Sequence, residues 1–194
     1  MAVLTGRGPR SWATAVAWFL AAGVLGCRGR AGAAVPAGAF RTFGVGDTLP
    51  PYAVPALGGD TVRFSAGEPV TLLNVWATWC TSCREEMKDV VALAREFAPR
   101  GLRVVAVSVD RGDPAHVQQF VASQRLPFTV GLDPEGEIQR RFAVVTVPTT
   151  YLIGSDGRLL WERSGNLQDV MPDARAAVGG ALEPRSPPAT RAGP

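Results

Sequence analysis

The chain has 194 residues, 46% of them hydrophobic and 19% charged, which excludes a wholly disordered protein and fits one domain with extensions. Its net charge of +3 is small, and its basic residues are scattered arginines with a single lysine, Lys88. Because no basic stripe runs along the sequence that could follow the phosphates of a nucleic acid, we expect no nucleic-acid partner.

Residues 1–26 are typical of an export signal, with Arg7 and Arg10 before an apolar run that ends in small residues. The run is short for a membrane-spanning helix. Its last four residues, Val24-Leu25-Gly26-Cys27, resemble the lipobox of bacterial lipoproteins, in which the cysteine becomes the lipid-bearing first residue. Two alternatives stay open: cleavage at residues 31–33, which would discard Cys27, and an uncleaved anchor.

Each of these three alternatives places the domain outside the cytoplasm, where disulfides can form. We therefore predict an extracytoplasmic protein, in the periplasm or on the outer face of the cell membrane, with a lipid anchor at Cys27. Cys27 then takes no part in the thiol chemistry of the domain, which keeps two cysteines, Cys80 and Cys83.

The rest of the chain is expected to consist of a linker, one domain and a tail. Residues 27–45 are rich in Gly, Ala and Pro and predict a flexible linker. The domain is expected to span residues 46–182. Residues 183–194, rich in Pro, Ala and Arg, predict a disordered tail.

Within the domain, short strands and helices are expected to alternate. The apolar run 70–77 predicts a central strand that is covered on both faces, and the apolar spacing over 81–98 predicts a helix. The other expected elements are strands at 52–57, 61–64, 102–109, 128–132, 149–153 and 158–163 and helices at 114–123, 135–142 and 166–182. This order predicts an α/β fold with a mixed central β-sheet flanked by helices and an N-terminal β-hairpin extension.

The two cysteines lie where the central strand gives way to the helix. Sulfurs three residues apart on a first helical turn can form a disulfide, and the amides and dipole of the helix N-terminus favour a thiolate at Cys80. We predict Cys80 as the nucleophile and Cys83 as the resolving thiol that attacks the mixed disulfide. The redox-active pair itself carries the chemistry, and no cofactor is expected.

Two alternative roles for the cysteines are weaker. A purely structural disulfide would close so small a loop that it would stabilise the fold by only about 2 kcal/mol. A zinc site needs two more ligands, and the domain offers one histidine, His116, which is expected on the surface of another helix. We therefore expect no metal.

Several segments carry a resemblance to a known family, namely residues 74–87, 107–110, 147–153 and 156–157. Together they resemble the TlpA-like and ResA-like extracytoplasmic branch of the thioredoxin superfamily, over about residues 46–182. The resemblance implies a thioredoxin-like fold in which Pro148 is cis and lies beside the cysteines, with the Val147 backbone pairing with an incoming extended peptide. The alternative for Pro148 is an ordinary proline at a strand edge.

The resemblance also implies a role for Glu86, because this family often has an acidic residue close to the cysteines. If Glu86 is partly buried, its pKa would be raised and it could move protons to or from the Cys83 sulfur. The alternative is a surface glutamate near the favourable end of the helix dipole. Asn74 lies where the thioredoxins that give the superfamily its name have a buried acid, so that proton route is not available from this position.

Residues next to the cysteines are expected to contact substrate or cover the disulfide. Trp79, Thr81 and Ser82 are predicted substrate contacts, and Trp76 is expected either to shield the disulfide with Trp79 or to serve the core. Thr81-Ser82 replaces the X-Pro pair that is commoner in the family, so the reduction potential cannot be transferred from relatives.

The resemblance implies a membrane-tethered thiol-disulfide oxidoreductase that reduces disulfides of specific partner proteins, as in cytochrome c maturation or metal-site assembly. A transmembrane electron donor would recharge it. Three alternatives stay open: a disulfide-forming oxidase or isomerase, a peroxiredoxin-like peroxidase, and a non-enzymatic binding lipoprotein with an idle cysteine pair. The Pro-x-x-x-Thr-x-x-Cys pattern expected of the peroxidase is absent.

Overall fold

The computed structural model describes residues 42–183. The predicted export signal, Cys27, the linker up to residue 41 and all but the first residue of the predicted tail lie outside the described residues. In the described part of the chain, no helix is long and apolar enough to cross a membrane.

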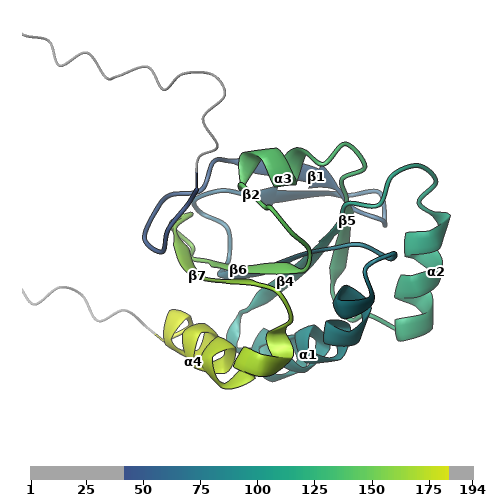
Figure 1. Ribbon diagram of the computed structural model, residues 1–194. Helices are drawn as coiled ribbons and strands as arrows, with labels where there is room; N and C mark the ends of the chain where they lie inside the picture. Colours follow the sequence, from purple (N-terminus) through teal and green to yellow (C-terminus); the bar gives the residue numbers. More distant parts are fainter. Residues whose placement is uncertain (1–41, 184–194) are drawn as a thin grey trace, which may run out of the picture. The chain divides into compact units, whose positions relative to one another are not determined.

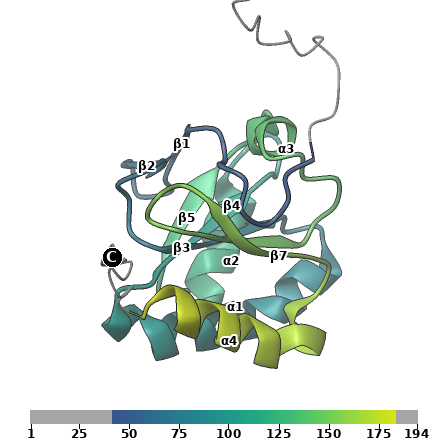
Figure 2. The same cartoon turned by 90° about the vertical axis from the view of Figure 1, so that its left-hand side faces the viewer.

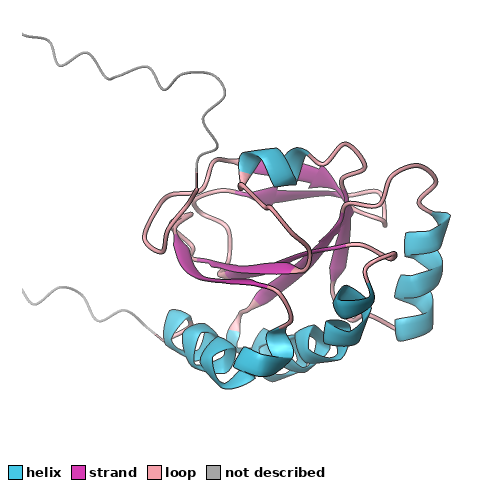
Figure 3. Ribbon diagram, in the orientation of Figure 1, coloured by secondary structure: helices cyan, strands magenta, loops and turns pink. Residues whose placement is uncertain are grey.

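A mixed five-stranded sheet, with strand order β5-β4-β3-β6-β7, forms the centre of the domain (Figure 3). The first half is parallel, because β3 pairs with β4 and β4 with β5 in the same direction. The second half is antiparallel, with β6 against β3 and β7 against β6. The strands are β3 (Thr71–Trp76), β4 (Arg103–Ser108), β5 (Thr129–Leu132), β6 (Thr149–Ile153) and β7 (Leu159–Ser164).

Helices and a separate hairpin cover the two faces of this sheet. In Figure 1, α1 and α4 lie below the sheet, and α3 lies above it with the β1–β2 hairpin. The hairpin consists of β1 (Tyr52–Pro55) and β2 (Thr61–Phe64). The helices are α1 (Thr81–Phe97), α2 (Ala115–Gln124), α3 (Glu137–Arg141) and α4 (Met171–Ala181), with 3-10 turns η1 (Ala98–Arg100) and η2 (Leu167–Val170).

The two faces of the sheet have different cores. Every residue of β3 is buried, and Leu72 packs with α1 and α4 in a largely aliphatic cluster. The opposite face holds aromatic rings in contact with one another, from Tyr52, Phe64, Phe142 and Tyr151. Figure 2 shows α1 and α4 together on one side of the sheet, with the hairpin and α3 on the other. A strand covered on both faces reads as a continuous apolar run, which is why β3 could be predicted.

The structure confirms the predicted α/β thioredoxin-like fold with its N-terminal hairpin. Most boundaries differ from the expectation by one or two residues, and two of the differences have a visible cause. The first hairpin strand ends at Pro55, because the next two residues turn to the edge of β5, where the Leu57 amide donates to the Val130 carbonyl at 2.8 Å. The last helix is divided into η2 and α4 at Met171, and Pro172 in the first turn of α4 has no N–H to continue the preceding turn.

Candidate active site

Cys80 and Cys83 form a disulfide at the junction between β3 and α1. Cys80 is the N-cap of α1, with its Cα 5.2 Å from that of Cys83. The Cys83 amide donates to the Cys80 sulfur at 3.2 Å, in the position where it would stabilise a thiolate after reduction. Cys80 keeps 8% of its surface exposed and Cys83 none, so of the two residues only Cys80 touches solvent.

The loop before Cys80 is held by hydrogen bonds of the amide, the hydroxyl and the carbonyl of Thr78. Its amide donates to Asp110 Oδ2 at 2.9 Å, and its hydroxyl donates to the other oxygen of the same carboxylate. Its carbonyl accepts from Arg84 Nη1 at 2.6 Å. Asp110 follows the end of β4, the neighbour of β3 in the sheet, so the sheet and the first turn of α1 hold the approach to Cys80 from two sides.

Pro148 has a cis peptide bond with Val147, as the resemblance implied. The Val147 carbonyl oxygen lies 3.7 Å from the Cys80 sulfur, which places this bond beside the disulfide. Pro148 is buried, and its carbonyl accepts from the Gly165 amide at 2.8 Å. The prediction that Pro148 is cis and adjacent to the cysteines is confirmed, and its pairing with a substrate stays a prediction.

Glu86 is completely buried, one helical turn after Cys83. Its Oε1 accepts from Asn74 Nδ2 at 2.6 Å and its Oε2 from the Leu167 amide at 3.0 Å. The pKa of Glu86 is raised to about 7, mainly because burial removes the carboxylate from water. The two hydrogen bonds lower this pKa, and the nearby charge of Asp89 raises it. Of the two alternatives for Glu86, the structure supports the buried carboxyl that can change protonation near neutral pH.

Asn74 has a role that the sequence reasoning missed. Its Nδ2 donates to Glu86 and, at 2.9 Å, to the Thr150 hydroxyl of the neighbouring strand β6. The sequence reasoning considered only the acid that Asn74 lacks. A signal was present, because a single polar side chain within a buried apolar run needs a partner.

The tryptophans before the disulfide differ in their surroundings. Trp76 is fully buried and packs on Phe120 of α2, with ring centroids 5.0 Å apart. Trp79 is 66% exposed and directly precedes Cys80. Between the cysteines, Thr81 is exposed and Ser82 is half-buried. Of the two tryptophans, only Trp79 is therefore open to an approaching partner.

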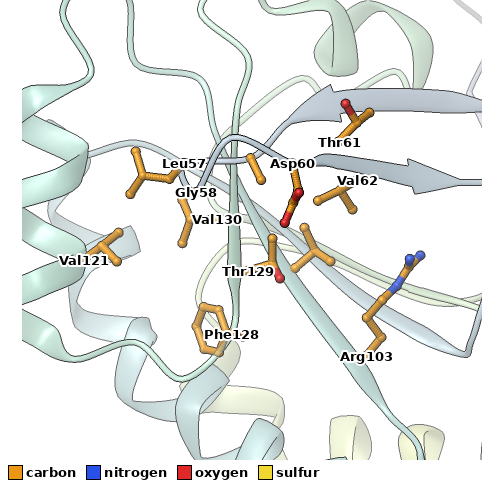
Figure 4. A pocket seen from close by; sticks show the side chains of 12 residues that line it. Leu57, Gly58, Asp60, Thr61, Val62, Arg103, Val121, Phe128, Thr129 and Val130 are labelled. Carbon is orange, nitrogen blue, oxygen red and sulfur yellow. The ribbon is translucent and has the colours of Figure 1, made fainter.

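Other candidate sites lie away from the disulfide. His116 is exposed on α2, as expected. Among residues 42–183, no cluster of three or more His, Cys, Asp or Glu side chains could hold a metal ion. A cavity of about 570 Å³ lies between the hairpin turn, β5 and α2, and Figure 4 shows Leu57, Val121 and Phe128 around it. The cysteines, Glu86 and Pro148 do not line this cavity, so it is separate from the disulfide site.

A disulfide at the start of the helix that follows a central strand, beside a cis-proline, defines a thioredoxin-like thiol-disulfide oxidoreductase. The comparisons agree with this class. Residues 45–161 match the AhpC/TSA family. The chain belongs to this family and, within it, to the thiol-disulfide oxidoreductases of the ResA type.

Two relatives and one solved structure illustrate the similarity. The thiol-disulfide oxidoreductase ResA of Oceanobacillus iheyensis is 33% identical over 147 residues, covering 68% of this chain and 76% of the relative. ResA of Bacillus thuringiensis subsp. konkukian is 33% identical over 123 residues, covering 62% and 70%. A Chlorobium tepidum protein described as a thiol:disulfide interchange protein DsbE has a TM-score of 0.67 and 28% identity, covering 73% of this chain and 100% of its own.

The residues before the cysteines distinguish this site from a peroxidase centre. A Pro-x-x-x-Thr-x-x-Cys pattern ending at Cys80 would need Pro and Thr at positions 73 and 77, which are Leu73 and Ala77. A pattern ending at Cys83 would need them at positions 76 and 80, which are Trp76 and Cys80. The AhpC/TSA match therefore comes without the peroxidase pattern, and the paired cysteines indicate dithiol-disulfide exchange.

Proposed function

We propose that this protein is an extracytoplasmic, membrane-tethered reductant of disulfides in specific partner proteins. The main support for this proposal is that the two cysteines lie in different environments. Cys80 is partly exposed beside cis-Pro148, and Cys83 is fully buried one helical turn from the buried carboxyl of Glu86. The export signal and the lipobox-like sequence ending at Cys27 support the location and the tether.

Exchange would begin with the reduced pair. The Cys80 thiolate attacks one sulfur of the substrate disulfide, and the other substrate sulfur leaves as a thiolate and takes up a proton. Cys83 then attacks the Cys80 sulfur of the mixed disulfide and releases the second substrate sulfur as a thiol. Two electrons pass to the substrate, and the protein is left with the Cys80–Cys83 disulfide seen in the structure.

Glu86 would serve the second of these steps. Cys83 must lose its proton to become a nucleophile, and water cannot take that proton because Cys83 is fully buried. The Glu86 carboxyl has a pKa of about 7 and lies one helical turn away, so it can accept the proton near neutral pH. The Asn74 and Leu167 hydrogen bonds favour its ionised, accepting form.

The substrate would approach as an extended segment across the exposed side of Cys80. The Val147 carbonyl oxygen lies 3.7 Å from the Cys80 sulfur, and this closeness supports pairing of the segment with the Val147 backbone. Because proline has no N–H, pairing along this segment would stop at Pro148, directly before β6. Trp79, Thr81 and Ser82 line the approach as predicted contacts, and Trp79 offers the largest exposed apolar surface beside the disulfide.

The resulting disulfide would have to be reduced again, and we propose a transmembrane electron donor for this step. A tether supports both exchanges, because it raises the local concentration of membrane-bound partners. Cytochrome c maturation and assembly of metal sites are the pathways in which such a reductant would act.

The reduction potential of the Cys80–Cys83 pair tests the direction of electron flow. The full chain is equilibrated with mixtures of reduced and oxidised dithiothreitol or glutathione, and tryptophan fluorescence reports the fraction reduced. We expect a potential near that of thioredoxin, about −270 mV, which suits a reductant. A value near about −120 mV would overturn the proposal in favour of a disulfide-forming oxidase.

A further inference from the structure

A groove between α1 and the end of α2 begins next to the disulfide. It is a cavity of about 410 Å³, which we call the α1–α2 groove, and its main lining residues are Arg84, Met87, Lys88, Val91, Arg95 and Leu126. Three of them, Arg84, Lys88 and Arg95, are exposed cations. Along the sequence these cations appear scattered, and α1 brings them to one groove.

Within the described part of the chain, the cations of the groove form no ion pair with a carboxylate. Among residues 42–183, the ion pairs link other cations to carboxylates: Arg103, Arg141, Arg158 and Arg175. The groove contains one acidic side chain, Glu85, against three cations. A further exposed cation, Arg125, stands between two lining residues, Gln124 and Leu126. The groove therefore carries an excess of positive charge that the described residues leave unpaired.

The floor of the groove is apolar. Met87 is buried, and Val91 and Leu126 are half-buried between the cations. A row of cations over an apolar floor fits an extended peptide that carries acidic side chains, because its backbone and methylene groups can contact the floor. A flat lipid surface would reach the cations but not the floor.

The groove is linked directly to the reactive centre. Arg84 follows Cys83, and its guanidinium donates to the Thr78 carbonyl, in the loop that leads to Cys80. From Arg84 to Arg95 the helix rises about 16 Å, which an extended chain covers with about five residues. Cys80, the N-cap of α1, precedes Arg84 by four residues, about 6 Å of helix rise, which an extended chain covers with roughly two residues. A chain whose cysteine reacts at Cys80 could therefore enter the groove roughly two or three residues away from that cysteine.

We propose that the α1–α2 groove binds an acidic segment of the partner protein whose disulfide is exchanged at Cys80. This inference rests on the proposed function and adds a substrate class to it: partners with an acidic run about three to seven residues from the reacting cysteine. The cations speed the encounter by attraction, and the apolar floor holds the segment during exchange.

Model peptides with one cysteine, blocked as a disulfide with 2-mercaptoethanol, test the inference with the full chain. Two peptides carry a run of five acidic residues at about three to seven residues from the cysteine. In one peptide the run precedes the cysteine, and in the other it follows the cysteine. A third carries serines there, and a fourth carries the acidic run farther away. The measured quantity is the second-order rate constant with which the reduced protein releases 2-mercaptoethanol or peptide from each.

At about 0.05 M salt we expect at least one of the two closely spaced acidic peptides to react about tenfold faster than the serine peptide. The advantage should disappear at about 1 M salt, where screening acts over about 3 Å. It should also be lost in the double variant Lys88→Glu/Arg95→Glu. A control with the same charge change far from the groove, Arg63→Glu/Arg140→Glu, should keep it.

Four outcomes would overturn the inference: equal rates for the acidic and serine peptides, an equal advantage for the distant acidic run, an advantage that survives in Lys88→Glu/Arg95→Glu, or loss of the advantage in the control variant. If the reversed charges impair folding, Lys88→Gln/Arg95→Gln gives the same comparison. Binding of the full chain to phosphatidylglycerol vesicles that needs Lys88 and Arg95, without any peptide preference, would assign the groove to a lipid surface instead. Failure with every peptide would contradict the proposed function itself.

Discussion

The two sulfurs of the disulfide lie in contrasting surroundings. Cys80 faces the surface, beside the Val147 carbonyl and exposed Trp79. Cys83 is fully enclosed, one turn from a buried carboxyl that the strand residue Asn74 holds in place. The difference teaches that the fold gives the two sulfurs separate environments, which suits the proposed exchange: Cys80 would meet the protein partner, and Cys83 would lose its proton away from water.

The largest expected effect separates the two cysteines. Cys80→Ser should abolish exchange with protein disulfides, because no accessible sulfur remains to attack. Cys83→Ser should still attack but cannot resolve, so it should accumulate mixed disulfides that appear on non-reducing gels. Trapping by Cys80→Ser with Cys83 intact would reverse the assigned roles.

The next effect concerns Glu86 and the stability of the oxidised protein. A carboxyl with its pKa raised from 4.5 to about 7 binds more protons in the folded state, so the free energy of unfolding should fall as pH rises from about 4.5 through about 7. The full difference is about 3 kcal/mol. Glu86→Gln should flatten this dependence in denaturant titrations across pH, and Glu85→Gln on the exposed side of α1 should leave it intact. Parallel slopes in Glu86→Gln and wild type would refute the assignment.

A smaller effect is expected at Asn74. Asn74→Ala should lower the free energy of unfolding by about 1–3 kcal/mol, because it leaves buried Glu86 without one hydrogen bond. The lost hydrogen bond lowered the pKa of Glu86, so that pKa should rise in the variant. The pH-dependent part of the stability curve should then extend to higher pH. Movement to lower pH would contradict the described geometry.

The smallest effect on stability is expected on the surface side. Trp79→Ala should change the free energy of unfolding by less than about 0.5 kcal/mol, because the side chain is mostly exposed. Exchange with protein disulfides should nevertheless weaken several-fold, while exchange with dithiothreitol stays unchanged. Equal losses with both would assign Trp79 to the chemistry of the cysteines and not to partner contact.

The sequence was informative where a feature is local. The apolar run of β3 and the helical spacing of α1 predicted these two elements and the mixed α/β sheet, and the position of the cysteines between them predicted that they can form a disulfide. The thioredoxin-like form of the fold came from the family resemblance. Contacts between distant residues could not be read in this way. The hydrogen bond between Leu167 and Glu86 joins residues far apart in the sequence, and the burial of Glu86 decided between two open alternatives.

The cations of the α1–α2 groove show the same limit. Lys88 and Arg95 appear as scattered charges in the sequence, and only the neighbouring end of α2 turns their helix face into a groove. The cis bond of Pro148 was expected from a family resemblance, because no local property of the sequence requires it.

The most direct test of the contrast between the sulfurs is the pH dependence of the resolving step. A mixed disulfide between Cys80 and a peptide is formed at low pH, and peptide release is followed after a jump to higher pH. In the wild type we predict that release accelerates as pH rises through about 7, because ionised Glu86 accepts the Cys83 proton. In Glu86→Gln this rise should be lost and release should be about a hundredfold slower near neutral pH. The same rates and the same midpoint in both proteins would contradict the account.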